Sequence, residues 1–190
     1  MRRAVPLLAA LALLAGCSQS TDGSANPGGT ATTTTTASAG PTSTSAPADR
    51  PKAIDISGLE PCGLLTDAQR AEFGLDRPPQ QDDAPGKPGC SMSREDREHS
   101  IAIYLDSTRG VEAYTEPPRP GSTALQVGGF PAVMVESTNS LGLACAIHVD
   151  VSDGQSADVQ AYSLGDTDVP TLCRLVQPVA GAVVANLMNG

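Results

Sequence analysis

The middle of the chain alternates apolar and polar positions, which is the pattern of a strand with one buried face. The clearest stretch is 100–107, where Ile101, Ile103 and Leu105 occupy every second position. It predicts a half-buried strand, joined to an earlier strand by a charged turn at 94–98. Gly128-Gly129 predicts a turn or bulge between two more strands. The strands predicted in this part of the chain are 90–93, 100–107, 125–127 and 132–136.

The clearest hairpin spans residues 144–163, where two alternating stretches flank a turn sequence. A two-residue turn at Asp153-Gly154 would set apolar positions of one strand against polar positions of the other. A three-residue loop at 152–154 instead sets Val149 opposite Ala157 and places its glycine at a left-handed position. Because register follows the hydrophobic pattern, we predict the three-residue loop.

Helical signals mark both ends of this region. Thr66 and Gln69 have capping-box spacing, which predicts a short helix ending at Gly74. Residues 76–89, rich in proline and glycine, are expected to be loop. A last helix is predicted after an Asp168 cap, with a kink at Pro178. Its apolar stripe, which we interpret as core rather than a membrane span, is Leu172, Leu175, Val176, Val179, Ala180, Val183, Val184 and Leu187.

These elements predict an α+β fold. We expect an antiparallel sheet of about five to six strands, a short N-terminal helix and a longer C-terminal helix that covers one face of the sheet. The single globular domain is expected to span residues 52–190. It would leave the other face of the sheet partly wet.

The first 51 residues have a different character. Arg2 and Arg3 precede an apolar run at 4–14, as in a signal peptide of residues 1–16. Leu14-Ala15-Gly16-Cys17 resembles the bacterial lipobox, whose cysteine is acylated after cleavage. Residues 17–51 are then a lipidated cysteine and a disordered Ser/Thr/Pro/Gly tether. This predicts a lipid-anchored protein at the outer face of the cytoplasmic membrane.

The chain has five cysteines, and lipidation of Cys17 would leave an even number. In an oxidising compartment the four others, Cys62, Cys90, Cys145 and Cys173, predict two disulfides. Their spacings of 28, 55 and 28 residues do not match zinc-ligand spacing. Three pairings exist, and the sequence alone does not decide among them. The predicted hairpin register favours Cys145–Cys173. Cys62–Cys90 is favoured because Cys62 lies just before the first predicted helix and Cys90 just after the loop that follows it.

Charge and motifs narrow the function classes. Loss of the signal peptide would leave 10 basic and 21 acidic residues, a net charge of −11, which argues against nucleic-acid binding. The sequence has no G-x-S-x-G elbow, Gly-rich phosphate loop or H-E-x-x-H motif. We therefore predict no enzyme, no catalytic residue, no cofactor and no metal.

The predicted hairpin register places several polar side chains on one face of the sheet. His148 would face Asp158 on the side opposite the apolar one, with Tyr162 further along and Tyr104 on the polar side of its own strand. These four residues predict either a shallow ligand or partner face, or an exposed cross-strand pair. His99, beside the charged turn, is expected to be solvated.

A series of short motifs resembles the actinobacterial lipoprotein family DUF3558, a domain of unknown function, over about residues 60–187. The motifs are Pro61-Cys62-Gly63-Leu64-Leu65-Thr66, Gly89-Cys90 and Gly128-Gly129-Phe130-Pro131-Ala132-Val133, followed by Cys145 and Cys173. The sequence departs from the family pattern at Met92, where many relatives carry a tryptophan. The resemblance implies a cell-envelope location and no established reaction.

These observations leave three classes of function open. The tether, the acidic surface and the lack of catalytic motifs favour a non-enzymatic interaction or sensory accessory module that contacts another envelope protein. The alternative is a carrier for a small apolar envelope molecule, held between the sheet and a helix bent at Pro178. An enzyme is the least favoured.

Overall fold

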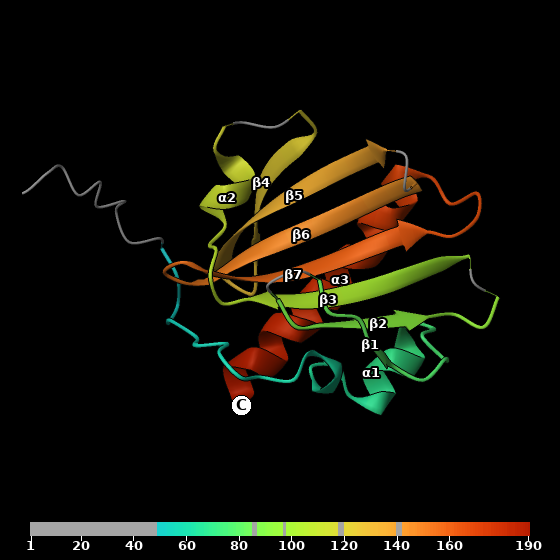
Figure 1. The fold of residues 1–190 in the computed structure, drawn as a ribbon, viewed down its shortest axis with the longest axis horizontal. Helices are drawn as coiled ribbons and strands as arrows, with labels where there is room; N and C mark the ends of the chain where they lie inside the picture. Colours follow the sequence, from blue (N-terminus) through green and yellow to red (C-terminus); the bar gives the residue numbers. More distant parts are fainter. Residues whose placement is uncertain (1–48, 85–86, 97, 118–119, 140–141) are drawn as a thin grey trace, which may run out of the picture. The chain divides into compact units, whose positions relative to one another are not determined.

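The computed structural model describes residues 49–190, except 85–86, 97, 118–119 and 140–141. Cys17, the expected signal peptide and the tether up to residue 48 lie outside the described residues. The fold is α+β (Figure 1). Its elements are η1 Pro61–Gly63, α1 Asp67–Glu72, β1 Gln80–Gln81, β2 Gly89–Ser93, β3 His99–Asp106, α2 Glu112–Thr115, β4 Ser122–Val127, β5 Phe130–Asn139, β6 Gly142–Ser152, β7 Gln155–Ser163 and α3 Val169–Asn189.

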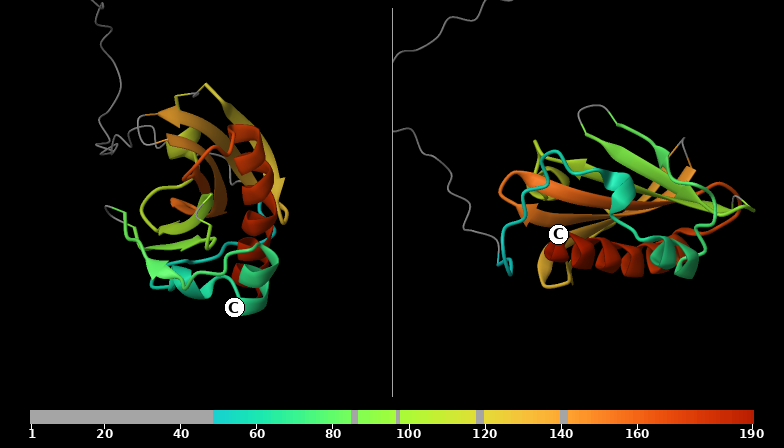
Figure 2. Two further views of the ribbon diagram at one scale, coloured as in Figure 1. Left: turned by 90° about the vertical axis from the view of Figure 1, so that its right-hand side faces the viewer. Right: turned by 90° about the horizontal axis from the view of Figure 1, so that it is seen from below.

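The seven strands form one antiparallel sheet in the order β1-β2-β3-β7-β6-β5-β4. The prediction of five to six strands was too low, because β1 lies within the expected loop at 76–89. Two residues at a sheet edge are too few to show an alternation. The helix α2 was missed because its four residues are too few to show a helical period. Figure 2 shows α3 on one face of the sheet and α2 on the other.

The central β6–β7 hairpin has the predicted register, with Val149 opposite Ala157 and His148 opposite Asp158. The predicted three-residue loop was wrong in detail. Ser152 pairs with Gln155, which leaves a two-residue turn, and the register shifts between Asp150 and Ser152. This irregularity restores the apolar register that a regular two-residue turn would have broken.

Helix α3 provides most of the cover on the first face. Asp168 caps it by accepting a hydrogen bond from the Thr171 N–H at 2.9 Å. The buried residues of α3 are Leu172, Cys173, Val176, Val179, Ala180, Val183, Val184 and Leu187. By length and composition this helix could cross a membrane. Its stripe instead packs mainly against β6 and β7 as part of the apolar core, as predicted for a core helix.

The helix α1 and the two disulfides close the ends of the core. Thr66 and Gln69 form the expected capping box, and Gly74 follows the helix at a φ of 68°. Cys62 bonds to Cys90, and Cys145 bonds to Cys173, as the register favoured. Each disulfide closes a separation of 28 residues. One ties the N-terminal segment to β2, and the other ties α3 to β6.

Strand β3 departs from the prediction of a half-buried strand. Ala102, Tyr104 and Asp106, on the expected wet side, are each at most 8% exposed. His99 is only 5% exposed, so its predicted solvation was wrong. Because β3 begins at His99, the alternation places this residue on the same face as Ile101.

The chain joins the domain slightly earlier than expected. Arg50, assigned from sequence to the tether, pairs with Asp150 at 2.5 Å and also with Asp153. Ile54 then donates a backbone hydrogen bond to Val151. The described chain therefore meets the domain beside the β6–β7 turn, at one end of the sheet.

Candidate functional site

A row of polar side chains crosses the sheet on the face opposite α3. The register places Tyr104 of β3, Asp158 of β7 and His148 of β6 side by side. His148 is 5% exposed and Asp158 is fully buried, so the expected exposed cross-strand pair was wrong. The burial arises because α2 and the segment before β2 cover this end of the face.

Asp158 is the centre of the cluster and accepts hydrogen bonds at both carboxylate oxygens. Its Oδ1 accepts from His148 Nδ1 at 2.8 Å and from the Ser156 hydroxyl at 3.1 Å. Its Oδ2 accepts from Lys87 Nζ at 2.6 Å and from the Tyr114 hydroxyl at 2.9 Å. A carboxylate only accepts, so His148 carries its proton on Nδ1 in this arrangement.

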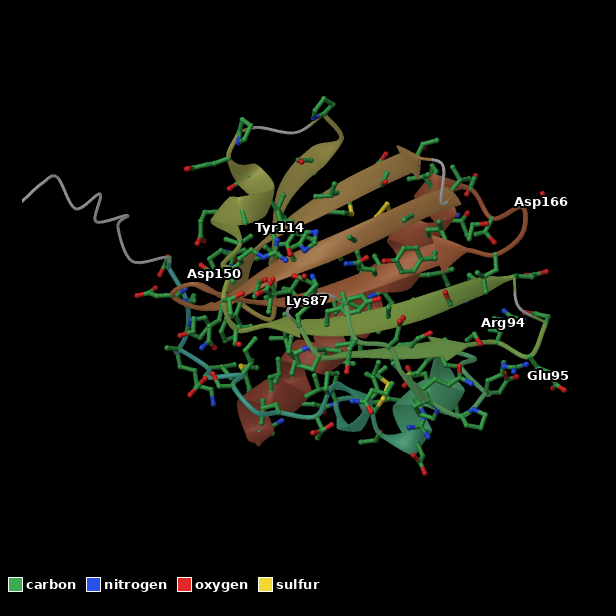
Figure 3. All side chains as sticks on the ribbon, in the orientation of Figure 1. Lys87, Arg94, Glu95, Tyr114, Asp150 and Asp166 are labelled. Carbon is green, nitrogen blue, oxygen red and sulfur yellow. A yellow bond between two sulfur atoms is a disulfide. The ribbon has the colours of Figure 1, made fainter. Side chains whose placement is uncertain are left out.

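Tyr114 holds the small helix α2 against the sheet. Its ring stacks on His148 with centroids 3.5 Å apart and an interplanar angle of 10°. Its hydroxyl reaches the buried carboxylate of Asp158, so one side chain makes both an aromatic and a polar contact. Figure 3 shows Tyr114 and Lys87 in front of the sheet, at the same end as Asp150.

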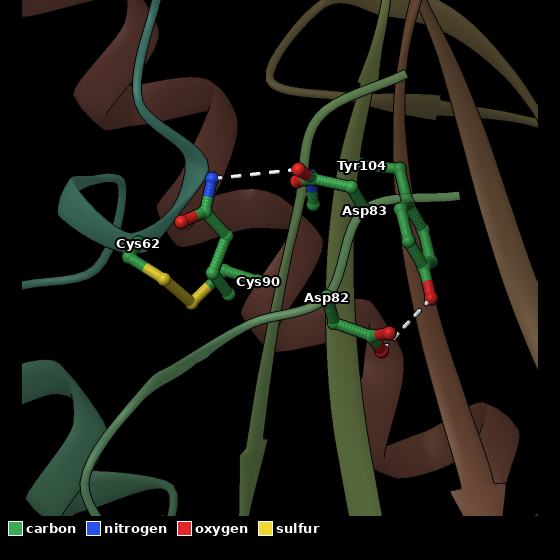
Figure 4. The surroundings of a disulfide bond; sticks show 7 residues. Cys62, Asp82, Asp83, Cys90 and Tyr104 are labelled. Atoms are coloured by element: carbon green, nitrogen blue, oxygen red, sulfur yellow. Dashed lines mark hydrogen bonds between the residues drawn. A yellow bond between two sulfur atoms is a disulfide. The ribbon is translucent and has the colours of Figure 1, made fainter. Parts of the chain in front are cut away.

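The segment that supplies Lys87 lies flat on Tyr104. The Tyr104 hydroxyl donates to Asp82 at 3.1 Å, and the Gly89 N–H donates to Asp83 at 3.0 Å (Figure 4). A Cβ at Gly89 would lie 2.2 Å from the Asp82 carbonyl oxygen and 2.4 Å from the Tyr104 ring. Only glycine permits this approach, which also brings Lys87 Nζ to 5.1 Å from the centre of the Tyr104 ring.

The burial of these side chains shifts their pKa values. Burial by itself would raise the pKa of Asp158, but the hydrogen bonds and charges of His148 and Lys87 hold it below its usual value. Burial raises the pKa values of Tyr104 and Tyr114 well above the ordinary one, and the neighbouring carboxylates Asp82 and Asp158 add to the rise. Both phenols therefore stay protonated and act as donors.

A second row of acids lies next to the first, towards the β6–β7 turn. Asp106 of β3 and Asp150 of β6 both face Ser156 of β7. Arg109 pairs with Asp106 at 2.8 Å, and Arg50 pairs with Asp150 at 2.5 Å. Burial raises the pKa of Asp150, and the Arg50 contacts oppose that rise. Each buried acid in these rows therefore has its own cation.

The cluster braces the domain, and it occupies both carboxylate oxygens of Asp158. All four donors to Asp158 come from described residues, so neither carboxylate oxygen is open to a substrate. Removal of one partner from such a buried pair is costly, because it leaves a desolvated charge. Among the described residues, no group of three or more His, Cys, Asp or Glu side chains is arranged to hold a metal ion.

The structure brings the four predicted site residues onto one face. His148, Asp158 and Tyr104 share the row, and Tyr162, whose hydroxyl bonds to Gln160 further along the face, is near enough to interact with Tyr104 and Asp158. Burial also raises the pKa of Tyr162. Sequence analysis missed Lys87 and Tyr114. Lys87 follows a stretch rich in proline, and α2 is too short to show a periodicity, so neither carried a local signal.

Comparison with known proteins identifies the family of the chain. The model of the family described as "Protein of unknown function (DUF3558)" matches residues 12–186. The chain belongs to the DUF3558 family. No curated protein and no solved structure matches it. The family description gives no reaction and no ligand.

Proposed function

We propose that this DUF3558 protein is a lipoprotein held by Cys17 at the outer face of the cytoplasmic membrane, where its folded domain is a non-enzymatic interaction or sensory accessory module. The observation that carries the proposal is that aliphatic side chains pack the centre of the sheet face under α3, while the bonded cluster around Asp158 closes one end of the other face. The domain therefore offers partners an outer surface rather than an interior site.

The apolar face supports this interpretation. Ile147 and Val159 in the sheet and Val176 in α3 are all fully buried. This packing does not favour the alternative of a carrier, whose ligand would need room between the sheet and α3. One end of the polar face is closed as well, because the groups around Asp158 bond to one another.

The position of Arg50 also supports a tethered module. The described chain meets the domain beside Asp150 and Asp153, at one end of the β6–β7 hairpin. An anchor at Cys17 would act through this end.

The anchor is tested with Cys17→Ser in the full chain, followed by fractionation of cells. We expect the variant to leave the membrane fraction, because the lipid is then missing. Thr34→Ser is the matched control, since it introduces a serine within the tether of residues 17–51 and leaves the lipobox intact. Retention of the Cys17→Ser protein in the membrane would contradict the proposal.

The interaction role is tested by photocrosslinking of the lipidated chain in intact cells. A photoreactive residue would replace Leu164, which is 55% exposed, or Leu59, which is 38% exposed at a different part of the surface. We expect a discrete product with an envelope protein from one position and not from the other. Native mass spectrometry complements it, because a copurified small molecule lost on denaturation would favour the carrier instead.

A further inference from the structure

The end of the sheet far from Arg50 carries a small hollow that the cluster around Asp158 does not use. It has a volume of about 180 Å³ and lies between α1, the start of β3 and the first half of α3. Its lining is mainly apolar and includes Phe73, Ile101 and Leu175. An apolar cavity of about 150 Å³ can hold benzene, so this hollow suits one aromatic ring.

His99 supplies a polar group in this hollow. Its side chain is 5% exposed and lines the space, yet it has no hydrogen-bond partner among the described residues. In the part of the chain that the structure describes, only Ser122 Oγ is both sealed from solvent and unbonded. The His99 ring nitrogens therefore still reach open space, and an occupant with a hydroxyl group would satisfy one of them.

A second, acidic hollow adjoins the first. Glu98, Asp166 and Asp168 line it, and its volume is about 570 Å³. The two hollows are neighbours, because Arg174 of the first donates to Thr171 of the second at 2.7 Å. Among the described residues that line them, four carboxylates face one guanidinium. This charge favours a basic occupant.

The location suits a protein partner. His99 pairs with Ser163, the last residue of β7, whereas Arg50 binds at the turn that precedes β7. Strand β7 has nine residues, and its eight steps of about 3.3 Å place its two ends roughly 26 Å apart. Figure 3 shows Asp150 and Asp166 at opposite ends of the sheet. Leu164, an exposed apolar side chain, lies beside the acidic hollow.

We propose that this surface docks a basic segment of a partner protein, which inserts a tyrosine ring into the hollow at His99. The ring contacts the apolar lining, its hydroxyl bonds to the unpartnered imidazole, and flanking lysines or arginines lie over the acidic hollow. This proposal rests on the proposed interaction role and names the contact surface and the chemistry of the partner.

The test is calorimetric titration of the full lipidated chain in detergent with three pentapeptides. Each peptide has two lysines on either side of a central tyrosine, phenylalanine or serine. We expect the tyrosine peptide to bind about threefold to tenfold more tightly than the phenylalanine peptide, the value of one neutral hydrogen bond. The serine peptide should bind at least about tenfold more weakly than the tyrosine peptide, since it lacks the ring.

Two variants locate the contacts. His99→Leu keeps an apolar lining and should remove the preference for tyrosine over phenylalanine. Asp166→Lys, at an exposed position, should weaken all three peptides. Glu112→Lys is the matched control, because it makes the same charge change on α2 at the end near Arg50 and should leave binding unchanged.

Several results would overturn the proposal. These are equal binding of the three peptides, no binding by any of them, a tyrosine preference that survives His99→Leu, or equal effects of Asp166→Lys and Glu112→Lys. Any of them leaves the proposed interaction role standing if crosslinking still finds a partner at another surface. Loss of all crosslinks would instead remove the role itself.

Discussion

The two faces of the sheet are both buried, but by opposite chemistry. The face under α3 is closed by aliphatic side chains and the Cys145–Cys173 disulfide. The other face is closed at one end by Asp158, its cation Lys87 and the ring of Tyr114. Apolar packing tolerates small shifts of each group, whereas a buried carboxylate depends on particular partners. The polar face should therefore be the more fragile one.

The largest expected effect is at Lys87. Lys87→Met keeps the length of the side chain but removes the cation from buried Asp158, and we expect a loss of about 3–5 kcal/mol in the free energy of unfolding. Urea denaturation measures this loss. Arg94→Met is the matched control, because Arg94 pairs with Asp96 at the surface, and its denaturation midpoint should stay unchanged.

The double variant Lys87→Met/Asp158→Asn sharpens this test. Removal of the acid together with its cation leaves no buried charge, so the loss should be smaller than the sum of the two single losses. Equal losses for Lys87→Met and Arg94→Met, or simple additivity in the double variant, would contradict the idea of a coupled brace.

A smaller loss is expected on the apolar face. Leu172 of α3 is fully buried, and Leu172→Ala should cost about 3 kcal/mol through lost burial and the cavity that remains. Leu164→Ala removes the same atoms at a position that is 55% exposed and should have little effect. If Leu172→Ala proved more costly than Lys87→Met, the contrast between the two faces would be reversed.

The smallest expected effect is on the pH dependence of the stability of the domain. Burial lowers the pKa of His99 below 6.5, and the charge of Arg94 adds to this, whereas Asp96 and Glu98 oppose it. The unfolded chain therefore binds more protons as the pH falls through 6.5, and stability declines towards the folded pKa of His99. His99→Gln should lose less stability than the native chain between pH 7.5 and 5.5. Identical slopes in urea titrations would exclude this role.

The polar face has a later acid transition. Because the pKa of Asp158 lies below its usual value of 3.8, its stabilisation is present above that pH and is lost only as the pH falls further. His99 lies on the apolar face and Asp158 on the polar face. The apolar face should therefore begin to lose stability at a higher pH than the polar face.

Local patterns in the sequence determined most of the architecture. The capping residues Thr66 and Asp168 marked where α1 and α3 begin, because a cap acts on backbone groups within one turn. The apolar stripe of α3 and the alternation in β6 and β7 determined which faces meet. That register also placed His148 opposite Asp158 and favoured the Cys145–Cys173 disulfide.

Tertiary structure alone decided what covers the second face. The alternation in β3 assigns Tyr104 and Asp106 to one side, but it does not tell whether that side is wet. The cover comes from α2 and Lys87, whose short segments reach the face through long-range contacts with Asp158, His148 and Tyr104. Likewise, His99 is buried because α1 and α3 pack beside it. Periodicity reports the direction of a side chain, whereas burial depends on distant parts of the chain.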